Sequence, residues 1–206
     1  AQAGLEEMAR GTTVPVINAL SDDFHPCQLL ADLLTIREHK ANEDGDLKGL
    51  TLTFFGDGLS NMGHSYVLAG VTAGMHVRVA SPAAYAPRAD IIADADRIAA
   101  QTGGSVTLYT DPNEAASGSD VIVTDTWVSM GQSGAAKRKK ILAPYAVDAK
   151  LMSKASKSAI FMHCLPAYRG HEVSEEVLEG PQSVIFDEAE NRLHAQKAIL
   201  AWCFGA

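Results

Sequence analysis

The residues best suited to chemistry in this chain are His163 and Cys164, which follow the apolar run 160–162 and precede Pro166. A cysteine acts as a nucleophile only beside a base that can deprotonate it. His163 is a poor candidate for that base, because neighbouring residues of a strand point to opposite faces. A zinc site is also unsupported, since Cys164 has no C-x-x-C or H-x-C companion. Two interpretations remain open: a buried inert thiol, the usual state of a free cysteine, or a residue of a binding site.

A second candidate is Asp125, at the carboxyl end of the expected strand 121–125. Ligands of open α/β sheets bind at the carboxyl ends of strands. The loop that follows contains Ser129 and Gly131, so a carboxylate, a hydroxyl and exposed backbone N–H groups stand close together in the sequence. Such a set can bind the ammonium and carboxylate groups of an amino acid. The alternative is an aspartate that caps a helix in an ordinary loop.

Two helices carry the remaining candidates. His25 lies near the N-cap of a helix expected from Pro26 to about Lys40, and Gln28 is at its third position. A histidine at a helix start also fits a purely structural role. Arg192 is expected in the first turn of a last helix, from about 189 to 202, where a positive charge opposes the helix dipole. That unfavourable position suggests that Arg192 has a function.

The segment 56–63, G-D-G-L-S-N-M-G, occupies the place of a Rossmann dinucleotide fingerprint but departs from its spacing. Its third glycine comes two residues late, and Asp57 is poorly suited to lie beside a pyrophosphate. We therefore expect a tight strand-to-helix turn rather than a dinucleotide site. Asn61, at the start of the following helix, is placed to bind a small anion such as a carboxylate.

Strand and helix patterns alternate around these candidates. The expected strands are 14–18, 50–55, 75–80, 105–109, 121–125, 159–163 and 183–187. The expected helices cover about 26–40, 61–73, a segment with Ile91, Ile92 and Ile98, and about 189–202. Alternation with nearly continuous apolar strands predicts an α/β fold, a doubly wound parallel sheet with helices on both faces and a Rossmann-like architecture.

Composition narrows the class of protein. The 206 residues are 47% hydrophobic and 20% charged, which is typical of a globular domain. A net charge of −8 argues against nucleic acid and anionic membranes as partners, and the basic run 137–140 is expected to be a solvated face. No apolar run approaches the roughly 20 residues of a membrane span. Three widely spaced cysteines favour a reducing compartment, so we expect a cytoplasmic protein.

Taken together, four motifs resemble those of one family. They are H-P-C-Q at 25–28, D-T-W-V-S-M-G-Q at 125–132, H-C-L-P at 163–166 and D-E-A-E-N-R-L-H at 187–194. Their order and context resemble the ornithine carbamoyltransferases of the aspartate/ornithine carbamoyltransferase family, from about residue 12 to the C-terminus. H-P-x-Q alone would also fit aspartate carbamoyltransferases. The S-M-G loop and the cysteine of H-C-L-P favour the ornithine enzymes.

The resemblance implies transfer of a carbamoyl group from carbamoyl phosphate to the δ-amine of L-ornithine, giving L-citrulline and phosphate. It implies no metal, no organic cofactor and no covalent enzyme intermediate. By position, the catalytic residues would be His25, Gln28, Cys164 and Arg192. The carbamoyl phosphate ligands would be His25, Gln28, Arg192 and the backbone carbonyl of Leu165. The ornithine ligands would be Asn61, Asp125, Ser129 and Met130, with Cys164 beside the δ-amine and Asp125 near it.

Two departures from the family pattern bear on this expectation. Ser60 stands where the family more often has asparagine. The phosphate-binding S-T-R-T-R segment of the family's N-terminal domain has no match here. The expected parts are a remnant of the carbamoyl-phosphate domain (1–24), an interdomain helix (25–41), an ornithine-binding domain (42–188) and a returning C-terminal helix (189–206).

The family forms homotrimers largely through the unmatched domain, so we expect these 206 residues alone to be inactive or nearly so. Two alternatives stay open. One is a related carbamoyltransferase for another amine, such as putrescine or an acylated ornithine, which the S-M-G loop disfavours. The other is a module that binds an amino acid without turnover.

Overall fold

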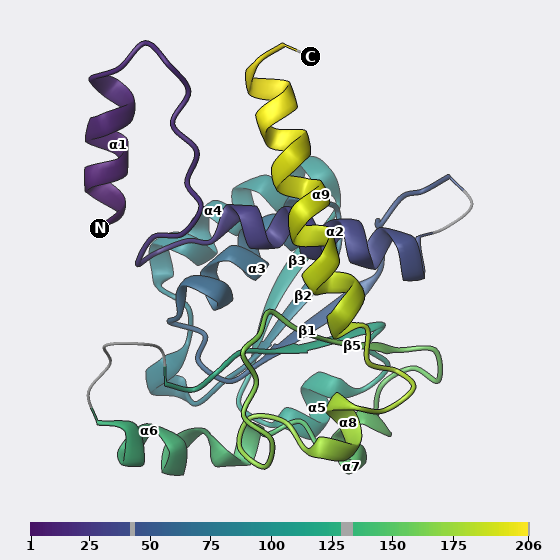
Figure 1. Ribbon diagram of the computed structural model, residues 1–206. Coiled ribbons are helices and arrows are strands. Elements are labelled where there is room, and N and C mark those ends of the chain that lie inside the picture. The colour runs from purple at the N-terminus through teal and green to yellow at the C-terminus, as the bar shows by residue number, and fades with distance from the viewer. Residues whose placement is uncertain (42–43, 129–133, 206) are drawn as a thin grey trace.

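The computed structural model describes residues 1–41, 44–128 and 134–205 and is built on one parallel sheet (Figure 1). Its five strands lie in the order β3-β2-β1-β4-β5. Their bounds are β1 Thr51–Phe55, β2 His76–Ala80, β3 Ser105–Tyr109, β4 Val121–Thr124 and β5 Ile160–His163. All neighbouring strands pair in parallel. Strand order reverses between β1 and β4, the place where open α/β sheets bind ligands.

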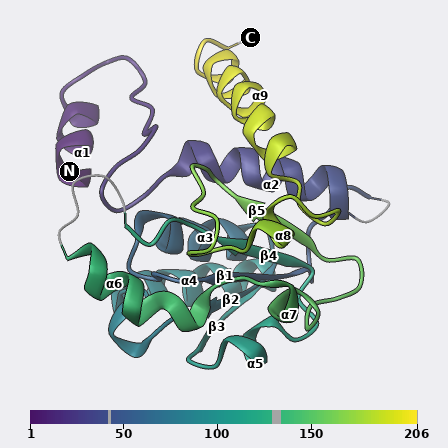
Figure 2. The ribbon, with the colours of Figure 1, turned by 60° about the horizontal axis from the view of Figure 1, so that its bottom comes forward.

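Helices cover both faces of this sheet, as the sequence predicted (Figure 2). Alternate strand residues point to opposite faces, so Leu52 and Phe54 pack in one hydrophobic cluster and Phe55 in the other. The helices packed on the first face are α2 Pro26–Lys40, α3 Asn61–Thr72 and α4 Ala89–Thr102. Those on the second are α5 Pro112–Ala116, α7 Ala149–Met152 and α8 Glu175–Leu178.

The remaining elements lie around this core. They are α1 Gln2–Arg10, α6 Ala135–Leu142, α9 Ile185–Cys203 and two 3₁₀ turns, Ala83–Tyr85 and Ala143–Tyr145. α1 buries none of its residues, and the C-terminal half of α9 projects away from the sheet (Figure 1). Exposed apolar side chains mark that half of α9: Leu193, Leu200 and Trp202. In the described part of the chain, no helix combines the length and the apolar character needed to cross a membrane.

Two expected strands are wrong. Residues 14–18 form no strand, and Val14 is 66% exposed, because this segment lies beside no sheet edge with which it could pair. Residues 183–187 make one short parallel bridge, between Ser183 and Phe161, and α9 then begins at Ile185. A short apolar run fits a buried strand and a buried helix equally well, so periodicity could not separate them.

The early start of α9 also changes the expected position of Arg192. This arginine lies seven residues after Ile185, in the interior of the helix, and so does not oppose the dipole of a first turn. Its position is set instead by the contact between α9 and α2, two helices that pack closely against each other. The function of Arg192 therefore has to be judged from what its guanidinium touches.

Candidate active site

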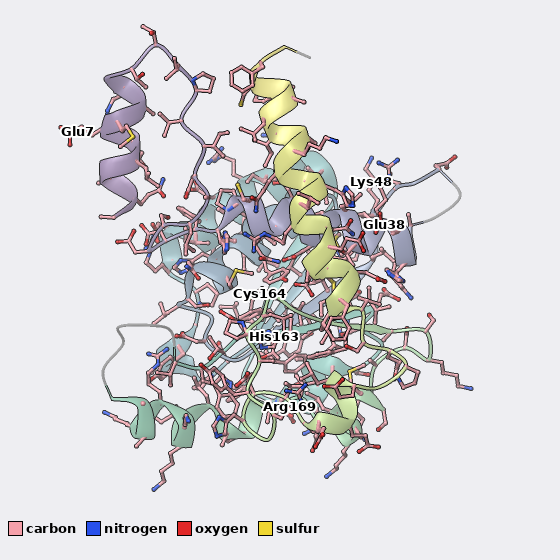
Figure 3. The ribbon with its side chains drawn as sticks, in the orientation of Figure 1. Glu7, Glu38, Lys48, His163, Cys164 and Arg169 are labelled. Carbon is pink, nitrogen blue, oxygen red and sulfur yellow. The ribbon has the colours of Figure 1, made fainter. Side chains whose placement is uncertain are left out.

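The register of the sheet places three candidate segments along one edge. Phe55 pairs with Thr124, and Thr124 pairs with His163, so these three strands end at the same level. The residues that follow them, Asp125 after β4 and Cys164 after β5, therefore emerge side by side. Figure 3 shows His163 and Cys164 near the centre of the molecule, beside α9. The carboxyl edge of the sheet thus meets α9 and the start of α2.

Gln28 and Arg192 join at this meeting point although 164 positions separate them. Gln28 is 1% exposed, and its side-chain oxygen accepts a hydrogen bond from Nη1 of Arg192. A cation is thus held at the N-terminal end of α2 by an uncharged amide rather than by a carboxylate, so its positive charge is not neutralised by that partner. Such a group can stabilise negative charge on a bound substrate.

His25 is the N-cap residue of α2, as expected. Burial and the positive charge of Arg192 lower its pKa to about 4. Its backbone N–H donates to the hydroxyl of Ser65 at 2.8 Å, and its Nδ1 is buried without a hydrogen-bond partner among the described residues. The imidazole is therefore neutral near pH 7, and a neutral imidazole can still donate one N–H to a ligand.

Cys164 and Asp125 form a second pair at the edge. The thiol Sγ donates to Oδ1 of Asp125 at 3.3 Å. Burial, with the nearby Asp125 carboxylate, raises the pKa of the Cys164 thiol well above its usual value. Burial also raises the pKa of Asp125, although the thiol hydrogen bond opposes that rise. Cys164 is therefore a protonated hydrogen-bond donor, which does not fit a nucleophile.

His163 lies closer to Cys164 than strand alternation predicted. One ligand atom each from Asp125, His163 and Cys164 lies within 4.8 Å of the others, because β5 ends at His163 and alternation stops there. The three could hold a metal ion, but a structural zinc site has four ligands and needs a thiolate. Cys164 instead keeps its proton and donates a hydrogen bond to Asp125.

The turn after β5 is held by His163. The backbone N–H of Leu165 donates to Nδ1 of His163 at 2.9 Å, so a neutral ring carries its proton on Nε2, 3.4 Å from Glu172 Oε1. Leu165 adopts a left-handed backbone with φ of 55°. Non-glycine residues in that region are uncommon and gather at ligand-binding sites. The Leu165 turn is therefore a candidate part of the site.

Asn61 is the first residue of α3, as expected, and its side-chain amide donates to the carbonyl of Ser21 at 3.1 Å. It makes no hydrogen bond to Asp125 or Cys164 in the part of the chain that is described. Ser129 and Met130 lie outside the described residues. Among the predicted site residues that are described, hydrogen bonds therefore join Gln28 with Arg192 and Asp125 with Cys164, and Asn61 is joined to neither pair.

Two buried carboxyl groups beside Gln28 were not predicted from the sequence. Asp32 is 0% exposed and Glu188 is 1% exposed. The signal was the i, i+4 spacing: Asp32 follows Gln28 by one turn of α2, and Glu188 precedes Arg192 by one turn of α9. Acidic residues on the buried faces of two packed helices could have been found that way.

Comparison with known proteins assigns the family. The family model described as the Asp/Orn binding domain of aspartate/ornithine carbamoyltransferase matches residues 48–203. The model of the carbamoyl-P binding domain of the same family matches residues 1–38. The chain belongs to the aspartate/ornithine carbamoyltransferase family.

Individual members of the family are closely similar to it. The chain is 66% identical over 203 residues to an ornithine carbamoyltransferase of Clavibacter sepedonicus, which covers 98% of this chain and 65% of the relative. It is 56% identical to that of Bifidobacterium longum, across 99% of this chain and 64% of the relative. The chain thus spans somewhat less than two thirds of the length of these curated relatives.

Solved structures agree on the fold. The ornithine carbamoyltransferase from Pyrococcus furiosus superposes with a TM-score of 0.89 at 48% identity, covering 97% of this chain and 62% of that one. The anabolic ornithine carbamoyltransferase from Campylobacter jejuni gives 0.91 at 41% identity, with coverages of 98% and 66%. The Rossmann-like α/β fold expected from the sequence is confirmed.

An ion pair holds the turn at 56–63, where the dinucleotide fingerprint fails. Asp57 is 7% exposed and pairs with Arg138 of α6, whose Nε also donates to the Trp127 carbonyl at 2.9 Å. Through Arg138, the turn after β1 is therefore connected to α6 and to the segment after β4. The basic run 137–140 was expected to be a solvated face, and Arg138 departs from that in part, since its side chain is 19% exposed and paired with Asp57.

Ser60, the departure from the family pattern, has a local role. It is the N-cap of α3, and its hydroxyl accepts from the backbone N–H of Gly63 at 3.0 Å. Serine is among the residues that cap helices best, so the change keeps the helix start intact.

Proposed function

We propose that the protein transfers a carbamoyl group from carbamoyl phosphate to the δ-amine of L-ornithine, giving L-citrulline and phosphate. The observation that carries the proposal is the Gln28–Arg192 contact beside the Cys164–Asp125 pair, at the carboxyl edge of a carbamoyltransferase sheet. Relatives that share 66% and 56% of their residues are ornithine carbamoyltransferases. The activity is proposed for a polypeptide of the relatives' full length.

The carbamoyl end of the reaction is assigned to α2, α9 and the Leu165 turn. His25 and Arg192 would donate to the carbonyl oxygen, which gains negative charge when the amine attacks. Two kinds of donor fit that task here: a guanidinium hydrogen-bonded to the uncharged amide of Gln28, and an imidazole kept neutral by its low pKa. Gln28 Oε1 and the Leu165 carbonyl would accept from the carbamoyl NH₂, which carries only donors.

The amine end is assigned to the pair after β4 and β5. Asp125 would accept from the α-ammonium of ornithine, with Asn61, Ser129 and Met130 holding the α-amino-acid groups. Cys164 would lie beside the δ-amine, which must be neutral to attack. Its high thiol pKa keeps it protonated, so we assign it a placing role and no covalent step. Holding the two reactants together supplies the main rate advantage.

The expected division of the chain is part of the proposal: a carbamoyl-phosphate segment 1–24, an interdomain helix 25–41, an ornithine-binding domain 42–188 and a returning helix 189–206. The helix α9 supports it, because exposed Leu193, Leu200 and Trp202 on its projecting half suit packing against further polypeptide. We propose a homotrimer for the full-length protein. The three free cysteines support the expected cytoplasmic location.

Citrulline formation by the full-length protein tests the proposal. Carbamoyl phosphate is supplied with ornithine, putrescine or N-acetylornithine, and only ornithine should give rapid product. Arg192→Gln should reduce the rate by about 100-fold or more, as expected for a group that meets developing charge. The matched control is Arg169→Gln, because Arg169 is 53% exposed and pairs with Glu179 away from the site. Turnover of putrescine at the rate of ornithine would refute the assignment of ornithine as the substrate.

A further inference from the structure

A buried polar cluster stands behind the proposed carbamoyl site. Nε2 of Gln28 donates to Oδ1 of Asp32 at 2.7 Å and lies 3.4 Å from Oε1 of Glu188. The hydroxyl of Tyr66 donates to Oδ2 of Asp32 at 2.6 Å. The backbone N–H of His163 donates to Oε2 of Glu188 at 2.8 Å. Four elements, α2, α3, α9 and β5, thus contribute to the cluster. Residues of α3 and β5 hydrogen-bond the two carboxyl groups, and these in turn accept from the Gln28 amide.

Burial raises the pKa of both carboxyl groups of the cluster, Asp32 and Glu188. Burial raises the pKa of Asp32 to about 6, and hydrogen bonds from Tyr66, Gln28 and Glu188 oppose that rise. Burial and the nearby Asp32 raise the pKa of Glu188 well above its usual value. Two adjacent buried carboxylates would be very unfavourable, so only one of the pair is ionised. Asp32 accepts the two short hydrogen bonds, from Tyr66 at 2.6 Å and Gln28 at 2.7 Å, whereas Gln28 lies 3.4 Å from Glu188. We therefore assign the charge to Asp32 and the proton to Glu188. The positive charge of Arg192 also lowers the pKa of Asp32.

The cluster leaves the amide of Gln28 one orientation. Its NH₂ faces two carboxyl groups, and its oxygen faces the Arg192 guanidinium, which has donors only. A flipped amide would set oxygen against the Asp32 carboxylate and NH₂ against the guanidinium, and so would lose both hydrogen bonds. A carbamoyl NH₂ also has donors only, so it needs the oxygen of Gln28 and would be repelled by the flipped form.

We propose that the buried pair Asp32–Glu188 positions Gln28 for carbamoyl phosphate, by fixing the amide with its oxygen toward the carbamoyl group. Asp32 and Glu188 touch no substrate and act through Gln28. The inference rests on the proposed function, because it needs the carbamoyl group beside Gln28. It adds two positioning residues and a direction to the amide, and it makes the two carboxyl groups unequal.

Carbamoyl phosphate binding by the full-length protein, measured by calorimetry, tests this inequality. Asp32→Asn replaces the acceptor of the Gln28 NH₂ with an amide that can turn either way. It should weaken binding by about 10- to 100-fold, as expected for a lost hydrogen bond to a charged group. Glu188→Gln mimics the protonated carboxyl group and should cost less, about threefold to fivefold. A larger loss for Glu188→Gln than for Asp32→Asn would overturn the assignment of the proton.

A matched control separates positioning from packing. Thr35, one turn beyond Asp32 on α2, is 0% exposed and accepts from Asn191 of α9 at 2.9 Å without touching Gln28. Thr35→Val should lower the melting temperature but change carbamoyl phosphate affinity by less than about twofold. If Thr35→Val weakened binding as much as Asp32→Asn, the effect would be general α2–α9 packing and the proposal would be wrong.

A double-mutant cycle tests the route through Gln28. In a Gln28→Ala background, Asp32→Asn should cost less than about threefold, because the amide that it positions is gone. An unchanged cost in both backgrounds would refute the inference. If Asp32→Asn does not fold, Asp32→Ser, which is too short to reach Gln28, replaces it with the same expectation.

Failure of the proposed function is distinguishable from failure of this inference. A wild-type protein that binds carbamoyl phosphate but forms no citrulline refutes the function, while the binding cycle still decides the role of Asp32. A wild-type protein that does not bind carbamoyl phosphate refutes both.

Discussion

Replacing Cys164 with alanine separates the two ends of the proposed site. The change removes the thiol that donates to Asp125 at 3.3 Å and leaves a partly buried carboxylate with one donor fewer. A hydrogen bond to a charged group contributes about 1.5–3 kcal/mol, and a long bond from a weak S–H donor belongs at the lower end. About 1.5 kcal/mol corresponds to roughly a tenfold rise in the KM for ornithine.

The same change should alter the pH dependence of ornithine use. Because the thiol hydrogen bond lowers the pKa of Asp125, its loss raises that pKa further above the usual value. An aspartate that binds an ammonium group must be ionised, so the acid limb of kcat/KM for ornithine should move to higher pH in Cys164→Ala. Carbamoyl phosphate affinity should stay within about twofold of wild type.

Steady-state citrulline assays at several pH values, with calorimetry for carbamoyl phosphate, measure these effects. Cys203→Ala is the control for loss of a thiol, since Cys203 lies at the far end of α9. Equal losses in ornithine use and carbamoyl phosphate binding would refute the reasoning, because Cys164 would then support the whole edge of the sheet. An unshifted acid limb would refute the coupling to Asp125.

Further predictions concern stability, pH and chain length. Ser60→Ala removes the N-cap bond to Gly63 and should lower the free energy of unfolding by about 1 kcal/mol in urea titrations, with an unchanged midpoint as the contrary result. Asp57→Asn breaks the buried pair with Arg138 and should cost about 3 kcal/mol; a loss below about 1 kcal/mol would show that the pair is dispensable. The lowered pKa of His25 keeps it neutral from about pH 8 to about pH 6, so carbamoyl phosphate affinity should vary less than about twofold there. A loss over that range that His25→Asn lacks would contradict this. The 206 residues alone should form little citrulline, and turnover equal to that of the full-length protein would disprove the need for further polypeptide.

The parts of the fold that sequence predicted are those with an unambiguous period. The strand expected at 105–109 is β3, with the same bounds, and the helix expected from Pro26 to about Lys40 is α2. Residues 14–18 failed because β-type residues form a strand only beside a partner. Residues 183–187 failed because a short apolar run is compatible with both kinds of buried element.

The candidate site was predictable where order along the chain carried the information. Four short motifs placed Gln28 and Arg192 in one site, and the structure shows their contact. The nearness of Asp125 to Cys164 was expected from the family resemblance, and their hydrogen bond confirms it. The two residues alone could not show it, because the register of β4 and β5 brings them together. The cluster around Asp32 was not predicted for a related reason. Asp32 lies on α2, and only the packing of α9 against α2 brings Glu188 close to it.

A crystal structure of the full-length protein with carbamoyl phosphate and norvaline, an amino acid without the reactive amine, tests the central claim most directly. We predict that the carbamoyl oxygen lies at Arg192 and His25. The carbamoyl NH₂ should lie at the oxygen of Gln28 and the carbonyl of Leu165, and the end of the norvaline side chain should lie beside Cys164. Carbamoyl phosphate bound away from Gln28 and Arg192, or norvaline bound away from Asp125 and Cys164, would contradict it.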